Sequence, residues 1–278
     1  QELLEKKIDT PEEEIEKIWK NIDPEIVVKK FGRVDNFWGP TGNEGPCGPT
    51  TEIYVNGVEV WNLVFNQYYQ KTDGTLEELK TPGIDTGMGL ERLVMVVQQK
   101  ADIFETDLLF GLIERVPKDV PLRIKRIIAD HIRALTFLVA AGVLPSNKDQ
   151  GYILRRLMRR VIIQGQVHGE IDFGALFQWL CNNYGGIYPE LDQQKIVLTF
   201  TEEEKKFAKT LQQGLRELEK VEQLTAGTAF RLYESYGLPY EIIKDLGGEK
   251  ANDLTREQFD AEFKKHQDKS RAGTEKKF

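Results

Sequence analysis

Cysteine and histidine are scarce in this sequence, and their scarcity excludes domains stabilised by several disulfides and domains built around a zinc-ligand cluster. Two cysteines, Cys47 and Cys181, and three histidines occur among 278 residues. Two cysteines allow one disulfide at most, so a scaffold of disulfides is excluded, and such sparing use fits a reducing cytoplasm. The three histidines are scattered, so the sequence holds no zinc-ligand cluster. We therefore expect a cytoplasmic protein without zinc.

Long apolar runs and a positive charge balance are also missing. No run approaches the roughly 18 apolar residues that a membrane span needs, so we expect no membrane partner. The first residues are acidic rather than signal-like, and the chain begins with Gln1 instead of Met, which fits a fragment of a longer protein. A net charge of -7 argues against a globally basic nucleic-acid binder but leaves local basic patches open.

The pattern of residues changes near position 100. Before it, β-branched and aromatic runs at residues 51–70 meet at Asn56-Gly57, which predicts antiparallel strands joined by a tight turn. Residues 85–99 read as the end of a strand, a glycine turn and a helix. The sequence thus predicts an α+β fold, with an antiparallel sheet and helices in residues 1–100 and an all-helical part in residues 101–278.

Two helices of the second part have clear patterns. The stretch PLRIKRIIADHIRALTFLVAAG repeats apolar residues at helical spacing, and Gly142 suits the end of that helix. Further on, Thr201 is followed three residues later by Glu204, which is the capping-box pattern. This pattern predicts that a long, charged helix begins at Thr201.

The stretch DTGMGLERL, residues 85–93, suits a phosphate site. It is not a dinucleotide fingerprint, because Arg92 stands where the third glycine should be and the preceding strands read as antiparallel. Gly87 and Gly89 let a ligand approach the backbone, and a helix starting near residue 90 offers unpaired N–H groups. Arg92 adds a fork of donors for phosphate oxygens, and Asp85 could hold an ammonium. An ordinary strand–turn–helix corner is the alternative.

A basic helix is predicted at residues 151–166, where four arginines occur with no acidic residue among them. Arg155 and Arg159, like Arg156 and Arg160, are four residues apart, so the four form one helix face. In a chain of negative net charge, this face predicts contact with nucleic-acid phosphates. The alternatives are a solvated face or a set of partners for acidic residues elsewhere.

Five segments, in order, resemble the alanyl-tRNA synthetase family of class II aminoacyl-tRNA synthetases. DTGMGLERL resembles motif 3 of class II enzymes in the form that this family has. The other four segments lie between about residues 30 and 245: NFWGPTGNEGPCGPTTEIY, EVWNLVFNQYY, IADHIRALTFLVAAGVLPSNKDQGYILRRLMRRVI and GTAFRLYESYGLP. The resemblance implies a class II antiparallel sheet with flanking helices, followed by a helical tRNA-recognition domain.

The family activates L-alanine with ATP and Mg²⁺ and transfers it to tRNA(Ala), and the resemblance implies a role for each matching residue. Arg92 would contact the γ-phosphate of ATP, Gly89 would lie against ATP, and Glu59 would contact Mg²⁺–ATP. Asp85 would bind the α-amino group of alanine. The pocket for the amino acid would be completed by Trp38, Asn62, Val64 and Gly87.

The resemblance also implies how the acceptor stem of tRNA(Ala) is read, because the family distinguishes its tRNA by a G·U pair in that stem. Asn147 stands at the position of the family's base-reading asparagine, and an amide suits an exposed base edge in the minor groove of RNA. Arg155, Arg156, Arg159 and Arg160 would contact tRNA. Glu234 stands where the family usually has an aspartate, so it keeps the charge on a side chain that is one methylene longer.

Motifs 1 and 2 of class II enzymes are not recognisable in this sequence. Motif 2 supplies the arginine that grips the α-phosphate, and Arg33 is the only arginine before Trp38, in a setting that matches the family's linker. We therefore expect the chain to need an N-terminal synthetase segment that carries both motifs. A non-catalytic RNA-binding relative, or a different enzyme that forms acyl-adenylates, are the alternatives.

Overall fold

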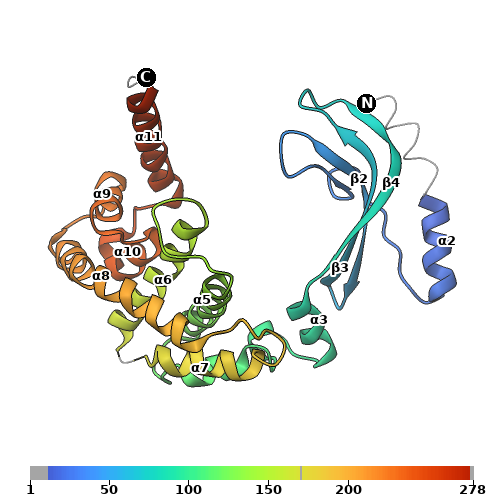
Figure 1. Ribbon diagram of the computed structural model, residues 1–278. Helices are drawn as coiled ribbons and strands as arrows, with labels where there is room; N and C mark the ends of the chain where they lie inside the picture. The colour runs from blue at the N-terminus through green and yellow to red at the C-terminus, as the bar shows by residue number, and fades with distance from the viewer. Residues whose placement is uncertain (1–11, 170, 276–278) are drawn as a thin grey trace. The chain divides into compact units, whose positions relative to one another are not determined.

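The computed structural model describes residues 12–169 and 171–275, which divide into two compact units (Figure 1). The first unit ends at Thr106 and the second begins at Asp107. The sequence predicts the division at residue 100, and the separate roles of the two parts stay predictions. Each unit is described by itself.

The first unit is built on an antiparallel sheet of four strands in the order β1-β2-β3-β4. Its helix α2, Glu12–Ile22, precedes the sheet, and α3, Leu90–Val97, and the 3₁₀ helix η1, Ile103–Glu105, follow it. Figure 1 shows β2, β3 and β4 as long, twisted strands. The strands are β1 Phe37–Trp38, β2 Gly45–Val55, β3 Val58–Gln70 and β4 Leu76–Met88.

The turn between β2 and β3 has the backbone that its sequence predicts. Asn56 and Gly57 have φ values of 53° and 81°, and tight hairpins favour Asn-Gly because both turn residues need positive φ. The antiparallel strands predicted at residues 51–70 are confirmed, and β2 also extends back to Gly45. Gly48 permits this extension, because a Cβ there would lie 1.7 Å from the backbone oxygen of Phe65.

The second unit consists of helices around an apolar core. Ile128, Ile132 and Leu135 on α5 are fully buried, as are Leu154 and Met158 on α6, which packs against α5. The helices are α4 Phe110–Arg115, α5 Leu122–Ala140, α6 Asp149–His168, α7 Phe173–Tyr184, α8 Gln193–Lys220, α9 Ala226–Tyr236, α10 Tyr240–Gly247, η2 Gly248–Ala251 and α11 Arg256–Glu275.

The predicted start of the long helix at Thr201 is wrong. Helix α8 begins at Gln193, and the side chain of Asp192 caps it by accepting a hydrogen bond from Lys195 N at 3.1 Å. The buried face of α8 includes Ile196 and Phe200, and it continues past Thr201 without a break. Thr201 therefore lies inside the helix, and the capping-box spacing after it is coincidental.

Disulfide bonding and membrane crossing can both be judged from the described residues. Cys47 and Cys181 are both free thiols, so the one possible disulfide is not formed. Burial raises the pKa of both thiols. Among residues 12–169 and 171–275, no helix combines the length and the apolar character needed to cross a membrane.

Candidate functional site

The register of β3 against β4 brings together four residues predicted to bind the amino acid. Asn62 lies opposite Gly87, and Val64 lies opposite Asp85. Residues directly opposite each other in an antiparallel pair project from the same face, and so do residues two apart on one strand. Asn62, Val64, Asp85 and Gly87 therefore share one face of the sheet, which we call the β3–β4 face.

The same face continues onto β2 through two residues that the sequence analysis missed. Glu52 lies opposite Asn62, and its Oε1 accepts a hydrogen bond from Asn62 Nδ2 at 3.3 Å. Tyr54, two residues along β2, donates its hydroxyl hydrogen to Glu52 Oε2 at 2.7 Å. The alternation of the TEIY segment is the sequence signal that places Glu52 and Tyr54 on one face.

Three buried polar atoms on β2 and β3 are unsatisfied. Within the described part of the chain, Thr50 Oγ1, Asn62 Oδ1 and Asn66 Oδ1 have no hydrogen-bond partner. Thr50 lies opposite Val64, and so belongs to the β3–β4 face. Buried polar atoms are satisfied in the great majority of cases, so an orphaned group is a candidate contact for a ligand.

The glycine turn places Arg92 beside Glu59. The predicted order of strand end, turn and helix is confirmed, because β4 ends at Met88 and α3 begins at Leu90 with Gly89 as its N-cap. Arg92 Nη1 donates to the Glu59 backbone oxygen at 3.1 Å and to Glu59 Oε2 at 3.0 Å. The two residues predicted to contact the ATP phosphates and Mg²⁺ therefore form one ion pair. The Arg92 side chain remains 53% exposed, so a ligand can reach it.

The remaining residues predicted for the pocket are less constrained by the structure. A Cβ at Gly87 would meet no atom of the described residues within 4 Å, so packing within this chain does not require glycine there. Trp38 lies on β1 opposite Gly48, and β2 separates β1 from β3 in the sheet. Their roles as walls of a pocket stay predictions.

Carboxylates in the described residues do not form a metal cage. No group of three or more His, Cys, Asp or Glu side chains in this part of the chain could hold a metal ion. Mg²⁺ in nucleotide sites is bound by one or two carboxylates together with substrate phosphates. Glu59 fits that arrangement as a single carboxylate, whereas a metal site made by protein alone does not fit.

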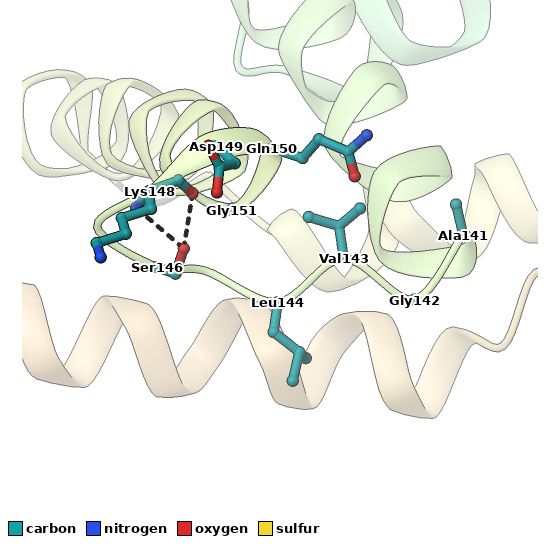
Figure 2. A pocket seen from close by; sticks show the side chains of 9 residues that line it. All are labelled: Ala141, Gly142, Val143, Leu144, Ser146, Lys148, Asp149, Gln150 and Gly151. Atoms are coloured by element: carbon teal, nitrogen blue, oxygen red, sulfur yellow. Dashed lines mark hydrogen bonds between the residues drawn. The ribbon is translucent and has the colours of Figure 1, made fainter.

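The loop that carries Asn147 is held by hydrogen bonds of Ser146. The Ser146 hydroxyl donates to the backbone oxygen of Lys148 at 2.9 Å and accepts from its backbone N–H at 3.2 Å (Figure 2). Gly151 is required nearby, because a Cβ there would lie 2.3 Å from Ser146 Oγ. Asn147 is exposed, and its Oδ1 accepts a hydrogen bond from Arg155 Nη1. The loop thus presents an exposed amide in a fixed backbone setting.

The four arginines of α6 do not form one unpaired basic face. Arg159 Nε pairs with Glu203 at 2.7 Å, and Arg160 Nη2 pairs with Glu241 at 3.1 Å. The alternative, that the arginines are partners for acidic residues elsewhere in the chain, therefore holds for these two residues. Arg155 and Arg156 instead lie near the ring of Tyr152, at 6.0 and 5.9 Å from its centroid.

We expect Arg159→Ala to lower the free energy of unfolding by about 1–3 kcal/mol, because it leaves the Glu203 carboxylate without its charge partner. The Glu203 side chain is only 6% exposed. Arg160→Ala is the matched control, because the Glu241 side chain is more exposed, and we expect a change of about 0–1 kcal/mol. Urea unfolding measures both changes, and a larger loss for Arg160→Ala would contradict the assignment.

Helix α9 carries Glu234 and is tied to α6. Glu234 Oε1 lies 2.7 Å from His266 Nε2 on α11, so the carboxylate already has one partner. Beside it, the Tyr233 hydroxyl is hydrogen-bonded to the Tyr152 hydroxyl at 2.9 Å. Burial and then this bond raise the pKa of Tyr233 to about 12. The hydroxyl pair thus connects the part of α6 that follows Asn147 with the helix that carries Glu234.

Comparison with known proteins identifies the family to which this chain is similar. Residues 55–278 match the family described as tRNA synthetases class II (A). The chain is 38% identical, over 94% of its length, to an alanine–tRNA ligase of Ruegeria sp. (strain TM1040), and it covers 34% of that protein. It is 37% identical, over 95% of its length, to an alanine–tRNA ligase of Borreliella afzelii (strain PKo), and it covers 51% of that protein.

A third relative, an alanine–tRNA ligase of Petrotoga mobilis, is 34% identical over 93% of the chain, which covers 34% of that protein. The chain therefore spans between about a third and a half of the length of these curated relatives. The family match covers most of the chain, including β3, β4 and α3 and the helical unit. This chain belongs to the class II (A) family of tRNA synthetases.

Proposed function

We propose that this chain is the part of an alanine–tRNA ligase that binds alanine, contacts the γ-phosphate of ATP and recognises the acceptor stem of tRNA(Ala). The observation that carries the proposal is the β3–β4 register, which sets Asn62 and Val64 beside Gly87 and Asp85 on one face. The three relatives described above are all named alanine–tRNA ligases, which supports the same activity.

The β3–β4 face has the chemistry that a small amino acid needs. The Asp85 carboxylate can neutralise the substrate ammonium, and the orphaned Asn62 Oδ1 can accept a hydrogen bond from it. Val64 is buried and apolar, and suits a methyl side chain. One methylene changes binding by only about 1–3 kcal/mol, so such a pocket can disfavour larger side chains but cannot strongly reject glycine.

Adenylate formation places most of its demand on phosphate contacts. The alanine carboxylate attacks the α-phosphorus of ATP, and pyrophosphate leaves. The site therefore has to hold the attacking and leaving oxygens in line and to stabilise the negative charge on the phosphates. Arg92 at the start of α3 would bind the γ-phosphate, and Gly89 lets the nucleotide approach the turn. Glu59 would hold Mg²⁺ on the phosphates, and the ion would supply further positive charge there.

Among residues 12–106, which the structure describes, the arginines are Arg33 and Arg92, and Arg92 is already assigned to the γ-phosphate. Arg33 precedes the sheet, and its guanidinium lies over the ring of Phe37 at 4.6 Å. We propose that the arginine required for the α-phosphate contact comes from an N-terminal synthetase segment that carries motifs 1 and 2. A non-catalytic RNA-binding relative is the second candidate, and the exposed Asn147 loop beside Arg155 favours it, because these residues could bind RNA without alanine activation.

The tRNA side of the function falls to the helical unit. Asn147 would read a base edge of the acceptor stem, with its amide held by Arg155. Arg156 is exposed, and would contact backbone phosphates together with Arg155. Arg159 and Arg160 would contribute through the ion pairs that join α6 to Glu203 on α8 and to Glu241 on α10. Glu234 would approach the stem through the helix that the Tyr152–Tyr233 pair connects to α6.

Alanine-dependent exchange of pyrophosphate into ATP tests this function. The chain alone should show no exchange, and adding an N-terminal segment with motifs 1 and 2 should restore it with alanine as the amino acid that is used best. Robust exchange by the chain alone would contradict the need for that segment. If the completed enzyme shows no exchange but the chain binds acceptor-stem RNA, the RNA-binding alternative is correct.

A further inference from the structure

We propose that Glu52 is a positioning residue for amino-acid binding, which fixes the Asn62 amide so that its oxygen meets the substrate ammonium beside Asp85. This inference rests on the proposed function, and it assigns a role to Glu52, which is not among the residues predicted to bind the amino acid. Three features of the sheet carry it: the orientation of the amide, the anchoring of Glu52, and the position of the unsatisfied oxygen.

The orientation of the Asn62 amide is decided by chemistry. Asn62 Nδ2 lies 3.3 Å from Glu52 Oε1, across directly opposite positions of β2 and β3. An ionised carboxylate can only accept hydrogen bonds, so the amide nitrogen has to face it. A flipped amide would bring two acceptor oxygens together and lose the bond. Glu52 therefore makes the amide oxygen, Asn62 Oδ1, point away from its own carboxylate.

Glu52 is itself held in place. Its second oxygen, Oε2, accepts the hydroxyl hydrogen of Tyr54 at 2.7 Å, so each carboxylate oxygen has one donor. Glu52 and Tyr54 are two residues apart on β2, which places both side chains on one face of the strand. A tyrosine hydroxyl is protonated at neutral pH and so can donate, and the hydrogen bond to Glu52 raises the pKa of Tyr54 further. The result is a short chain of bonds from Tyr54 through Glu52 to Asn62.

The oxygen that this arrangement leaves over is placed to bind an ammonium. Asn62 Oδ1 is buried and has no partner among the described residues. Its cross-strand neighbour on β4 is Gly87, two residues from Asp85 and without a side chain that could cover the amide. An ammonium group carries three hydrogens, so it can donate to the Asp85 carboxylate and to Asn62 Oδ1 at once. An amide turned the other way would present hydrogens to the cation.

The test is pyrophosphate exchange by the enzyme completed with its N-terminal segment. Glu52→Ala should raise the KM for alanine by about 10- to 100-fold, the size of a lost hydrogen bond to a charged group, while kcat and the KM for ATP stay within about twofold. Glu52→Gln should keep the KM for alanine within about threefold, because its amide oxygen can still accept from Asn62 Nδ2. Glu77→Ala, on the exposed part of β4, is the control and should change nothing.

A double substitution separates positioning from direct contact. Once Asn62→Ala has removed the amide, adding Glu52→Ala should raise the KM for alanine by less than about twofold further. If the increases in the KM for alanine that the two single substitutions cause multiply in the double variant, the proposal is overturned. It is also overturned if Glu52→Gln raises this KM as much as Glu52→Ala does. A wild-type enzyme without exchange refutes the proposed function itself. Wild-type exchange with an unaffected Glu52→Ala variant refutes only the role of Glu52.

Discussion

Arg92→Ala is expected to lower kcat/KM for ATP in alanine activation by about 100- to 1000-fold, the usual loss when one preorganised charge-stabilising donor is removed. Arg92 lies in the first turn of α3, and its guanidinium is held beside Glu59 by two hydrogen bonds of Nη1. Arg92→Lys should recover only part of the activity, because the lysine ammonium cannot reproduce the planar fork of donors of the guanidinium group.

The ion pair between Arg123 and Asp245 supplies a matched control for Arg92. Its Nη1–Oδ2 distance is 3.0 Å, equal to the Arg92–Glu59 distance, and both arginine side chains are more than half exposed. Exposed pairs of this kind contribute at most about 1 kcal/mol to stability, so neither substitution should unfold the protein. Equal losses of activity in Arg92→Ala and Arg123→Ala would show that the effect is not a phosphate contact.

Asp85→Asn is expected to raise the KM for alanine by about 100-fold while the KM for ATP changes little. The substitution keeps the shape of the side chain but removes the negative charge that would neutralise the substrate ammonium, and hydrogen bonds to charged groups are the strong ones. Asp85 lies opposite Val64 on an exposed stretch of β4, so its loss should not disturb the core.

Glu77→Gln is the control for Asp85, because Glu77 is an exposed carboxylate on the same strand that pairs with Lys71. It should leave both KM values unchanged. Steady-state exchange with alanine and ATP varied in turn measures the two variants. A parallel rise in both KM values for Asp85→Asn would indicate a general disturbance of the sheet and would remove Asp85 from the amino-acid site.

Local chemistry made part of the fold predictable. Asn56 and Gly57 form a tight turn because of their own backbone preferences, and the helix at Leu90 begins where the glycines end. The prediction that a helix begins at Thr201 was wrong because it also used local residues alone. A capping-box pattern is read from four residues, but the helix is set by a longer apolar face that includes Ile196 and Phe200.

Contacts between residues far apart in the chain could not be predicted from the sequence. The acceptors for Arg159 and Arg160 lie 44 and 81 residues away in the chain, so the basic run looked unpaired. The pairing of Glu52 with Asn62 could not be predicted from the sequence because the hairpin is irregular. A regular ladder from the Asn56-Gly57 turn would set Glu52 opposite Trp61, but a register shift between Ile53 and Tyr54 sets it opposite Asn62.

The central claim is that this chain selects alanine and its tRNA, and aminoacylation of acceptor-stem RNA tests it most directly. The chain, completed with an N-terminal segment that carries motifs 1 and 2, would be given two stems that differ only in a G·U or a G·C pair at the position that Asn147 is proposed to read. We predict that alanine is attached to the G·U stem and that the G·C stem is charged poorly. Equal charging of the two stems would contradict the proposal.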